Sequence, residues 1–324
     1  MEYRRLGDTE LEVSAIGLAA WPLTTSAWQG DDGEALAFLQ KSYDLGINFF
    51  DTADVDGHGK GEELLGKAFG GNRELVVLAT KIGYDFYNDP ASNGVSGSRR
   101  FDADYVRYAV ERSLERLSTD YIDLLQLHHP TLEAVHDDAL FATLEDLQTE
   151  GKIKCFGAAL GPGLGHHDEG VLAMRKRGAK TLSTIYNLFE QDPGRKFFTV
   201  ALETMTGILL RNPHGNGVLD DTATAPSEVK GGGYYPPRTE AWAREALEKR
   251  KKLAWIQKSG MTIGQAALRA YLWEETVPSA LVETQSLEQL GEFCETTDKP
   301  AFVREEIAEL AEQYRRNFDV PKAA

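Results

Sequence analysis

The sequence predicts a (β/α)8 barrel that forms one domain over residues 1–324, with a β-hairpin at the N-terminus. Apolar runs of strand length alternate with stretches of helical periodicity along the whole chain, which is typical of α/β folds with a parallel sheet. The length of 324 residues suits one barrel of this kind. Polar residues follow several of the predicted strands, at the end where such a barrel carries its chemistry.

The predicted inner strands share short apolar runs that stop at polar, glycine or proline residues. They cover residues 17–22 together with an outgoing loop, 47–50, 75–81, 121–130, 153–160, 181–188 and 280–282. The segment 197–202 is interpreted as a short helix paired with a candidate strand. The hairpin is predicted from polar–apolar alternation at 2–6 and 12–16 around Gly7.

The predicted helices have apolar residues three or four positions apart, and several stop at glycine. They cover residues 34–45, 64–69, 102–117, 137–150, 169–177, 239–258, 262–273, 286–295 and 302–318. Segments 83–100 and 210–238 are rich in Asn, Asp, Gly and Ser or Pro, and we predict that they are long loops. Because helical periodicity resumes directly after the second loop, it is not interpreted as a linker between domains.

Composition excludes several classes of partner. The chain has 51 acidic against 35 basic residues, a formal net charge of −16, and this field repels nucleic acid and anionic membranes. No apolar run is long enough to span a bilayer. Two cysteines, Cys155 and Cys294, do not make a disulfide framework. We therefore expect a cytoplasmic protein with a small-molecule substrate; the sequence predicts no oligomeric state.

Three neighbouring strands are predicted to end in residues that can exchange protons. Asp51 ends the first, Lys81 the second and His128 the third. In a parallel barrel these ends lie around one pocket, where neighbouring charges shift one another's pKa. Each residue alone could be a helix cap or part of a surface ion pair, but the three together favour an active site. Trp21 and His129 are candidate substrate-binding residues at the pocket mouth.

Several segments form a recognisable set of motifs. They are YRRLG at 3–7, LEVSAIGL at 11–18, NFFDTA at 48–53, EELLG at 62–66, ATK at 79–81, DLLQLHHP at 123–130, GKIK at 151–154 and YNL at 186–188. With them the chain resembles the aldo/keto reductase superfamily over nearly its whole length, most specifically in the first half. The resemblance implies a TIM barrel and NADPH-dependent carbonyl reduction by a catalytic Asp, Tyr, Lys and His. Asp51, Lys81 and His128 carry over, and Tyr186 becomes a further candidate substrate-binding residue.

The tyrosine of that set, which donates the proton in the family, has no counterpart here. Its position falls at Asp56. An ionised carboxylate has no proton to donate, and its charge opposes the alkoxide that hydride transfer creates. Lys81 nearby would favour the ionised form of Asp56. Asp56 is therefore a candidate catalytic residue with a role that differs from the family's acid.

The positions that bind the cofactor in the family also differ. The degenerate positions are Ala159 and Leu160 in place of Ser and Asn, Ser183 in place of Gln, and Glu283 and Gln285 in the adenosine-phosphate clamp. The arginine of that clamp is missing, and the carboxylate of Glu283 would repel a 2′-phosphate. The family's Tyr-Ser-Pro-Leu segment aligns with residues 201–204, which contain no aromatic residue to lie under the nicotinamide. The expectation is that no cofactor binds, with NADPH as the alternative.

Three functions remain open on these residues. The first choice is a non-redox enzyme of the lyase, dehydratase or isomerase type, which uses Asp51, Asp56, Lys81 and His128 on a hydroxylated or carbonyl substrate. The second is a nicotinamide-dependent carbonyl reductase whose proton donor is His128 or a water molecule. The third is a non-catalytic binding protein on the same fold. No metal is expected, since no motif has tight metal-ligand spacing.

Overall fold

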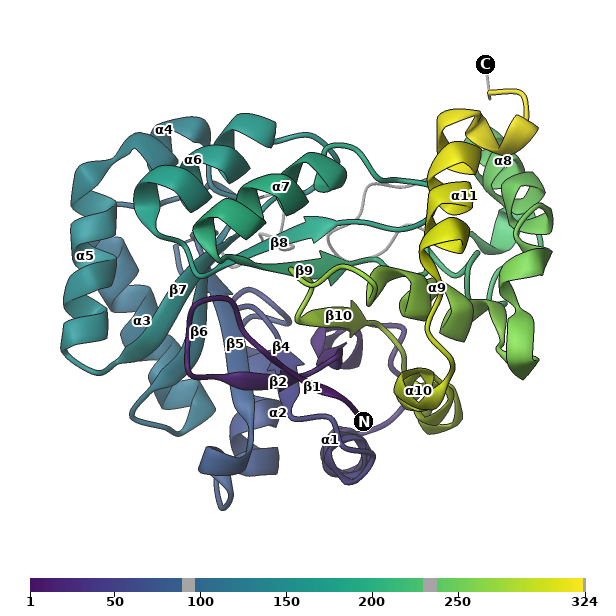
Figure 1. Cartoon of the computed structure of the whole chain (residues 1–324). Coiled ribbons are helices and arrows are strands. Elements are labelled where there is room, and N and C mark those ends of the chain that lie inside the picture. The colour runs from purple at the N-terminus through teal and green to yellow at the C-terminus, as the bar shows by residue number, and fades with distance from the viewer. Residues whose placement is uncertain (89–96, 230–237, 323–324) are drawn as a thin grey trace.

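A computed structural model of the protein describes residues 1–88, 97–229 and 238–322. Eight parallel strands close into a barrel in the order β10-β3-β4-β5-β6-β7-β8-β9 (Figure 1). The strands are β3 (Ile16–Ala19), β4 (Phe49–Asp51), β5 (Val77–Ile82), β6 (Ile122–His128), β7 (Ile153–Ala159), β8 (Thr181–Ile185), β9 (Gly207–Arg211) and β10 (Ser279–Val282). The predicted (β/α)8 barrel is confirmed.

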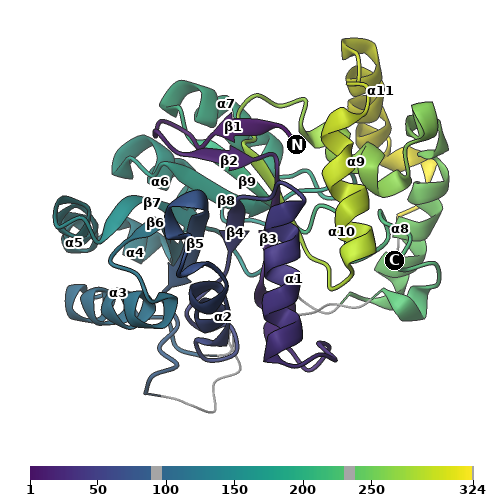
Figure 2. The ribbon, with the colours of Figure 1, turned by 90° about the horizontal axis from the view of Figure 1, so that it is seen from below.

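The predicted N-terminal hairpin is also confirmed. It pairs β1 (Tyr3–Arg5) with β2 (Glu12–Ser14) in antiparallel register and lies across one end of the barrel (Figure 2). Leu6 and Val13 of the hairpin are fully buried, in one cluster with barrel-interior residues such as Phe49. The hairpin therefore closes the end of the barrel opposite to the strand C-termini, and leaves the other end for chemistry.

The helices surround the barrel, and α8 and α11 gather on one side of it, at the right of Figure 1. The helices are α1 (Asp32–Asp44), α2 (Lys60–Phe69), α3 (Ala103–Leu117), α4 (Leu132–His136), α5 (Asp138–Thr149), α6 (His167–Arg177), α7 (Gly194–Thr204), α8 (Glu240–Lys251), α9 (Ile263–Tyr271), α10 (Leu287–Cys294) and α11 (Arg304–Arg315). Side-chain caps set several starts: Asp31 and Glu34 form a capping box at α1, and Thr262 and Gln265 form one at α9. Within the described ranges, no helix is both long and apolar enough to cross a membrane.

For the segment 197–202 the predicted helix is confirmed, but the candidate strand is wrong. These residues lie inside α7, and the neighbouring barrel strand is β9, further along the chain. Phe197, Phe198 and Ala201 are buried at helical spacing, which explains why the apolar run is a helix rather than a strand. The loop predicted at 210–238 therefore begins only after Arg211, and residues 230–237 of it, like 89–96 of the loop 83–100, lie outside the described residues.

A buried ion pair stabilises the barrel close to the start of β6. Asp123 Oδ2 accepts hydrogen bonds from Arg73 Nη2 at 2.5 Å and from the Leu78 amide at 2.9 Å, and Oδ1 accepts one from Lys154 Nζ at 2.7 Å. The side chains of Asp123 and Arg73 are 1% and 11% exposed. The carboxylate therefore compensates a guanidinium that is almost out of contact with water.

We expect Asp123→Asn to lower the free energy of unfolding by about 3 kcal/mol, because it leaves the buried Arg73 without its anion. Urea unfolding followed by circular dichroism measures this change. Glu240→Gln is the control, since the Glu240–Arg244 pair is 68% exposed on both sides and such pairs contribute about 1 kcal/mol or less. Equal effects of the two variants would contradict the prediction.

Candidate functional site

The C-terminal ends of β4, β5 and β6 bring a lysine, an aspartate and a glutamine into contact. Lys81 Nζ donates to Asp51 Oδ2 at 2.5 Å and to the Thr52 carbonyl at 2.7 Å. Gln126 Nε2 donates to Asp51 Oδ1 at 3.1 Å. All of these side chains are buried. The carboxylate thus fixes the ammonium from one side, while Gln126 fixes the carboxylate.

Gln126 was missed in the sequence. It precedes His128 by two residues on β6 and pairs in register with Lys81. Alternate residues of a strand face the same side, so the spacing of two residues from His128 could have predicted that Gln126 faces the site.

His128 is completely buried at the end of β6. Burial lowers its pKa well below the usual range of histidine, and the neighbouring His129, Lys81 and Arg211 lower it further. The imidazole is therefore neutral at physiological pH. A neutral ring can hydrogen-bond to a substrate oxygen but does not bring a positive charge to it.

Asp56 lies in the loop between β4 and α2, and its carboxylate contributes to the conformation of that loop. Its Oδ2 accepts hydrogen bonds from Thr52 Oγ1 at 3.0 Å and from the Ala53 amide at 2.8 Å. Lys81 directs its hydrogen bonds to Asp51 and Thr52. Asp56 is 5% exposed, and it contacts Thr52 and Ala53, the two residues that follow Asp51, as a turn-stabilising acceptor.

His129 is held by polar groups from three other segments. Its Nδ1 lies 2.7 Å from the hydroxyl of Tyr84, and its Nε2 lies 3.5 Å from Arg211 Nη1. Arg211 Nη2 also donates to the Leu160 carbonyl, and Arg99 Nη1 donates to the His129 carbonyl at 2.7 Å. Tyr84 and Arg211 were not predicted, because only the closed barrel shows that the ends of β5, β6 and β9 converge here.

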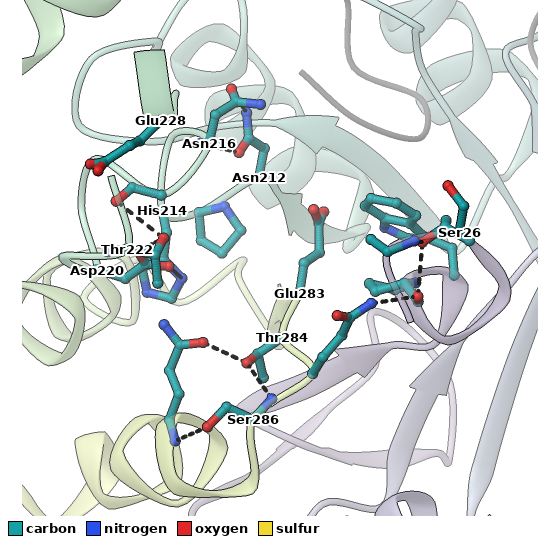
Figure 3. Close-up of a pocket in the computed structure, with 18 residues that line it drawn as sticks. Ser26, Asn212, His214, Asn216, Asp220, Thr222, Glu228, Glu283, Thr284 and Ser286 are labelled. Atoms are coloured by element: carbon teal, nitrogen blue, oxygen red, sulfur yellow. Dashed lines mark hydrogen bonds and ion pairs between the residues drawn. The ribbon is translucent and has the colours of Figure 1, made fainter. Parts of the chain in front are cut away.

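A cavity of about 780 Å³ opens where β3, β9 and β10 end. It is formed by the segment after β3, the turns after β9 and the β10–α10 connection (Figure 3). Its polar lining consists of Thr25, Ser26, Asn212, His214, Asn216, Asp220, Thr222, Glu228, Glu283, Thr284, Gln285, Ser286 and Gln289. Neither lysine nor arginine is among the described lining residues, so the cavity is acidic. Its volume is in the range of ordinary ligand pockets.

The predicted site residues lie in three regions: the cavity, the barrel mouth around Lys81 and His128, and the layer between the barrel and the helices. Trp21, Glu283 and Gln285 line the cavity. Three further candidates are buried at the barrel mouth, namely Ala159, Leu160 and Ser183. Ala159 pairs in register with both His128 and Ser183.

Tyr186 lies apart from the cavity and from the barrel mouth. Its ring packs edge-on against Phe198 of α7 and Tyr271 of α9, with centroid distances of 5.1 and 5.8 Å. The structure thus places this candidate in the layer between barrel and helices, and does not bring it to Lys81 or His128.

One alignment to the family motif needs correction. Residues 201–204 lie in α7, so they do not follow a strand of the barrel. The segment that follows β9 is Arg211-Asn212-Pro213-His214, and its last three residues line the cavity. The position of the family's Tyr-Ser-Pro-Leu segment is therefore Arg211 to His214, ten residues later than the sequence alignment placed it.

The chain matches the model of the aldo/keto reductase family over residues 15–315. Among curated proteins it is 28% identical to the uncharacterized oxidoreductase YqkF of Bacillus subtilis over 333 residues, which cover 100% of this chain and 99% of that one. It is 32% identical to the aldo-keto reductase YhdN of the same organism over 239 residues, or 71% of this chain and 67% of that one.

The chain is also similar to a fungal reductase and to a solved bacterial structure. Versiconal hemiacetal acetate reductase of Aspergillus parasiticus is 28% identical over 352 residues, with 100% and 98% coverage. Among solved structures, the holo form of aldo-keto reductase AKR11C1 from Bacillus halodurans superposes with a TM-score of 0.79 at 26% identity, covering 96% of both chains.

These comparisons correct two expectations. The first choice of a non-redox lyase, dehydratase or isomerase is wrong, because the relatives are named as oxidoreductases and reductases. The expectation that no cofactor binds is also wrong, since the fold and family are those of proteins that use NAD(P)H. Part of this error came from the misplaced segment 201–204.

The matched region covers the barrel, the cluster around Lys81 and the cavity. The chain belongs to the aldo/keto reductase family.

Proposed function

We propose that the protein is a carbonyl reductase that uses a nicotinamide dinucleotide to reduce a small aldehyde or ketone. The observation that carries the proposal is the buried Lys81–Asp51 pair together with the neutral His128 at the strand ends of the barrel. Two contacts connect this group to the cavity. Ala20, whose amide donates to the Asp51 carbonyl at 2.8 Å, directly precedes the cavity residue Trp21. Arg211 contacts His129 and directly precedes the cavity residue Asn212.

Each residue has a role that follows from its contacts. The bound dinucleotide supplies a hydride to the carbonyl carbon. The Lys81 ammonium, fixed by Asp51, stabilises the negative charge that develops on the carbonyl oxygen. The neutral His128 orients the same oxygen through a hydrogen bond. Within this proposal Asp56 stands where the family has its tyrosine, so the proton comes from a different group.

The cavity residues fit the adenosine end of a dinucleotide. α10 begins at the cavity, with Ser286 as its N-cap, and a helix N-terminus favours the charge of a pyrophosphate. His214 stacks on Phe293 at a centroid distance of 4.3 Å, which gives the cavity a flat wall. Glu283 is an acceptor suited to ribose hydroxyls. We therefore infer that the cavity holds the adenosine part, and that the nicotinamide lies toward Lys81 and His128.

The proposal is tested by titrating the protein with NADH and NADPH while following tryptophan fluorescence. Trp21 lines the cavity, so we expect micromolar binding accompanied by quenching, and reduced quenching in the variant Trp21→Phe. Consumption of NADH with a panel of aldehydes and ketones then measures turnover. An unchanged fluorescence at millimolar dinucleotide would contradict the proposed function.

A further inference from the structure

Tyr84 lies where the segments after β4, β5 and β6 meet. It follows Lys81 by three residues and is 2% exposed. Its ring packs with Ala53 and Val55 of the loop that also carries Asp56. The same ring meets the edges of His128 and His129 at centroid distances of 5.0 and 5.7 Å. A phenol is thus present at the barrel mouth, although it comes from a different strand end than the family's tyrosine.

The contacts of His129 determine whether the Tyr84 hydroxyl donates a hydrogen bond to its ring or accepts one from it. Arg211 carries only donors, so the ring nitrogen that faces it, Nε2 at 3.5 Å, is an acceptor. Burial, with the charge of Arg211 as the next cause, lowers the pKa of His129 well below its usual range, so the ring carries a single proton. That proton is on Nδ1, which donates to the Tyr84 oxygen over 2.7 Å. The hydroxyl hydrogen of Tyr84 then remains available for another acceptor.

The surroundings of Tyr84 suit a group that gives up a proton only during reaction. Burial raises the pKa of Tyr84, which keeps the phenol protonated at neutral pH, while Arg99 and Arg211 act in the opposite direction. The Nδ1–H of His129 and these two guanidinium groups stabilise a phenolate once it forms. Asp56 is a poorer donor, because its Oδ2 already accepts two hydrogen bonds as a carboxylate oxygen does.

We propose that Tyr84 is the proton donor of this enzyme and replaces the phenol that the family has at position 56. This inference rests on the proposed carbonyl reduction. Hydride addition to the carbonyl carbon moves the C=O π pair onto oxygen, and that oxygen takes the Tyr84 hydroxyl proton. The O–H bond of Tyr84 breaks to leave a phenolate, which regains a proton from solvent. Arg211 is a positioning residue that sets the tautomer of His129.

The test compares Tyr84→Phe with Tyr87→Phe. Tyr87 is a neighbouring phenol whose hydroxyl accepts a hydrogen bond from Arg116 at 2.8 Å. Among the described residues its ring packs with Phe86, Tyr105 and Tyr108 rather than with the two histidines. We expect Tyr84→Phe to lower kcat for aldehyde reduction by about 10²–10⁴-fold, with KM and the Kd for NADH changed less than about twofold. Tyr87→Phe should retain kcat within about threefold. Equal turnover of wild type and Tyr84→Phe would overturn the role of Tyr84 alone, whereas a wild type without dinucleotide binding would overturn the proposed function itself.

A measurement without cofactor tests the same inference in the wild-type protein, and so does not depend on folding of the variant. Nuclear magnetic resonance of protein carrying ¹⁵N-labelled histidine distinguishes the two tautomers. We expect His129 to carry its proton on Nδ1, and expect Arg211→Met to change this signal. A wild-type His129 protonated on Nε2 would overturn the inference, because Tyr84 would then donate its hydrogen to Nδ1.

Discussion

Replacing Lys81 by methionine is expected to lower kcat/KM for carbonyl reduction by about 10²–10³-fold, which is the usual effect of losing a donor to a developing oxyanion. The ammonium is buried and oriented by Asp51 Oδ2 and by the Thr52 carbonyl, so no solvent-exposed group can replace it. Steady-state kinetics with an aldehyde substrate measure the loss, and fluorescence titration shows whether the Kd for NADH is retained.

This variant also leaves Asp51 without its cation, and the free energy of unfolding should fall by about 3–5 kcal/mol. The double variant Asp51→Asn/Lys81→Met separates the two effects. It removes the uncompensated charge and keeps an acceptor for Gln126, so stability should largely return. Activity should not return. Recovery of activity together with stability would show that Lys81 acts only on folding.

The first half of the barrel could be predicted from the sequence because local signals there agree with one another. The runs that became β4, β5 and β6 are apolar, and they stop at Asp51, at Lys81 and at the two histidines. Strand ends of a parallel barrel converge, so placing these residues in one site needed no further information.

The second half could not be predicted equally well, for a physical reason. A buried apolar run of five or six residues is compatible with a strand and with one side of a helix. The run around Phe197 became part of α7, and the strand came later, at Gly207–Arg211. This shift misplaced one segment of the family motif by ten residues, and the residues that line the cavity could not be recognised in the sequence.

The contacts of Tyr84 and Arg211 with His129 could not be predicted even if every strand had been placed correctly. Both act on His129, but they lie 45 and 82 positions from it in the chain. Neither was part of a motif recognised in the sequence, and their relation depends on barrel closure and on the turn that places Tyr84 against the histidines. The absence of the family's tyrosine at position 56 was therefore a weak argument against carbonyl reduction, because function depends on the assembled site.

Glu283 is expected to make the protein bind NADH about 10-fold or more tightly than NADPH. It directly follows β10, and its carboxylate points into the cavity (Figure 3). A carboxylate accepts a hydrogen bond from a ribose 2′-hydroxyl but repels a 2′-phosphate, for which proteins commonly provide an arginine. Asp220 and Glu228 add negative charge to the same cavity. Fluorescence titrations with both dinucleotides at two ionic strengths measure the preference, which should decrease with salt.

The variant Glu283→Arg should reverse this order by converting the repulsion of a 2′-phosphate into a bidentate attraction. Glu283→Gln is the matched control, since it keeps the size of the side chain and removes only its charge. We expect it to weaken NADH binding slightly and to bring the two Kd values within about threefold, because the neutral amide neither repels nor attracts a phosphate strongly. A wild type with equal Kd values for the two dinucleotides, or an arginine variant that still prefers NADH, would place the 2′-position away from Glu283.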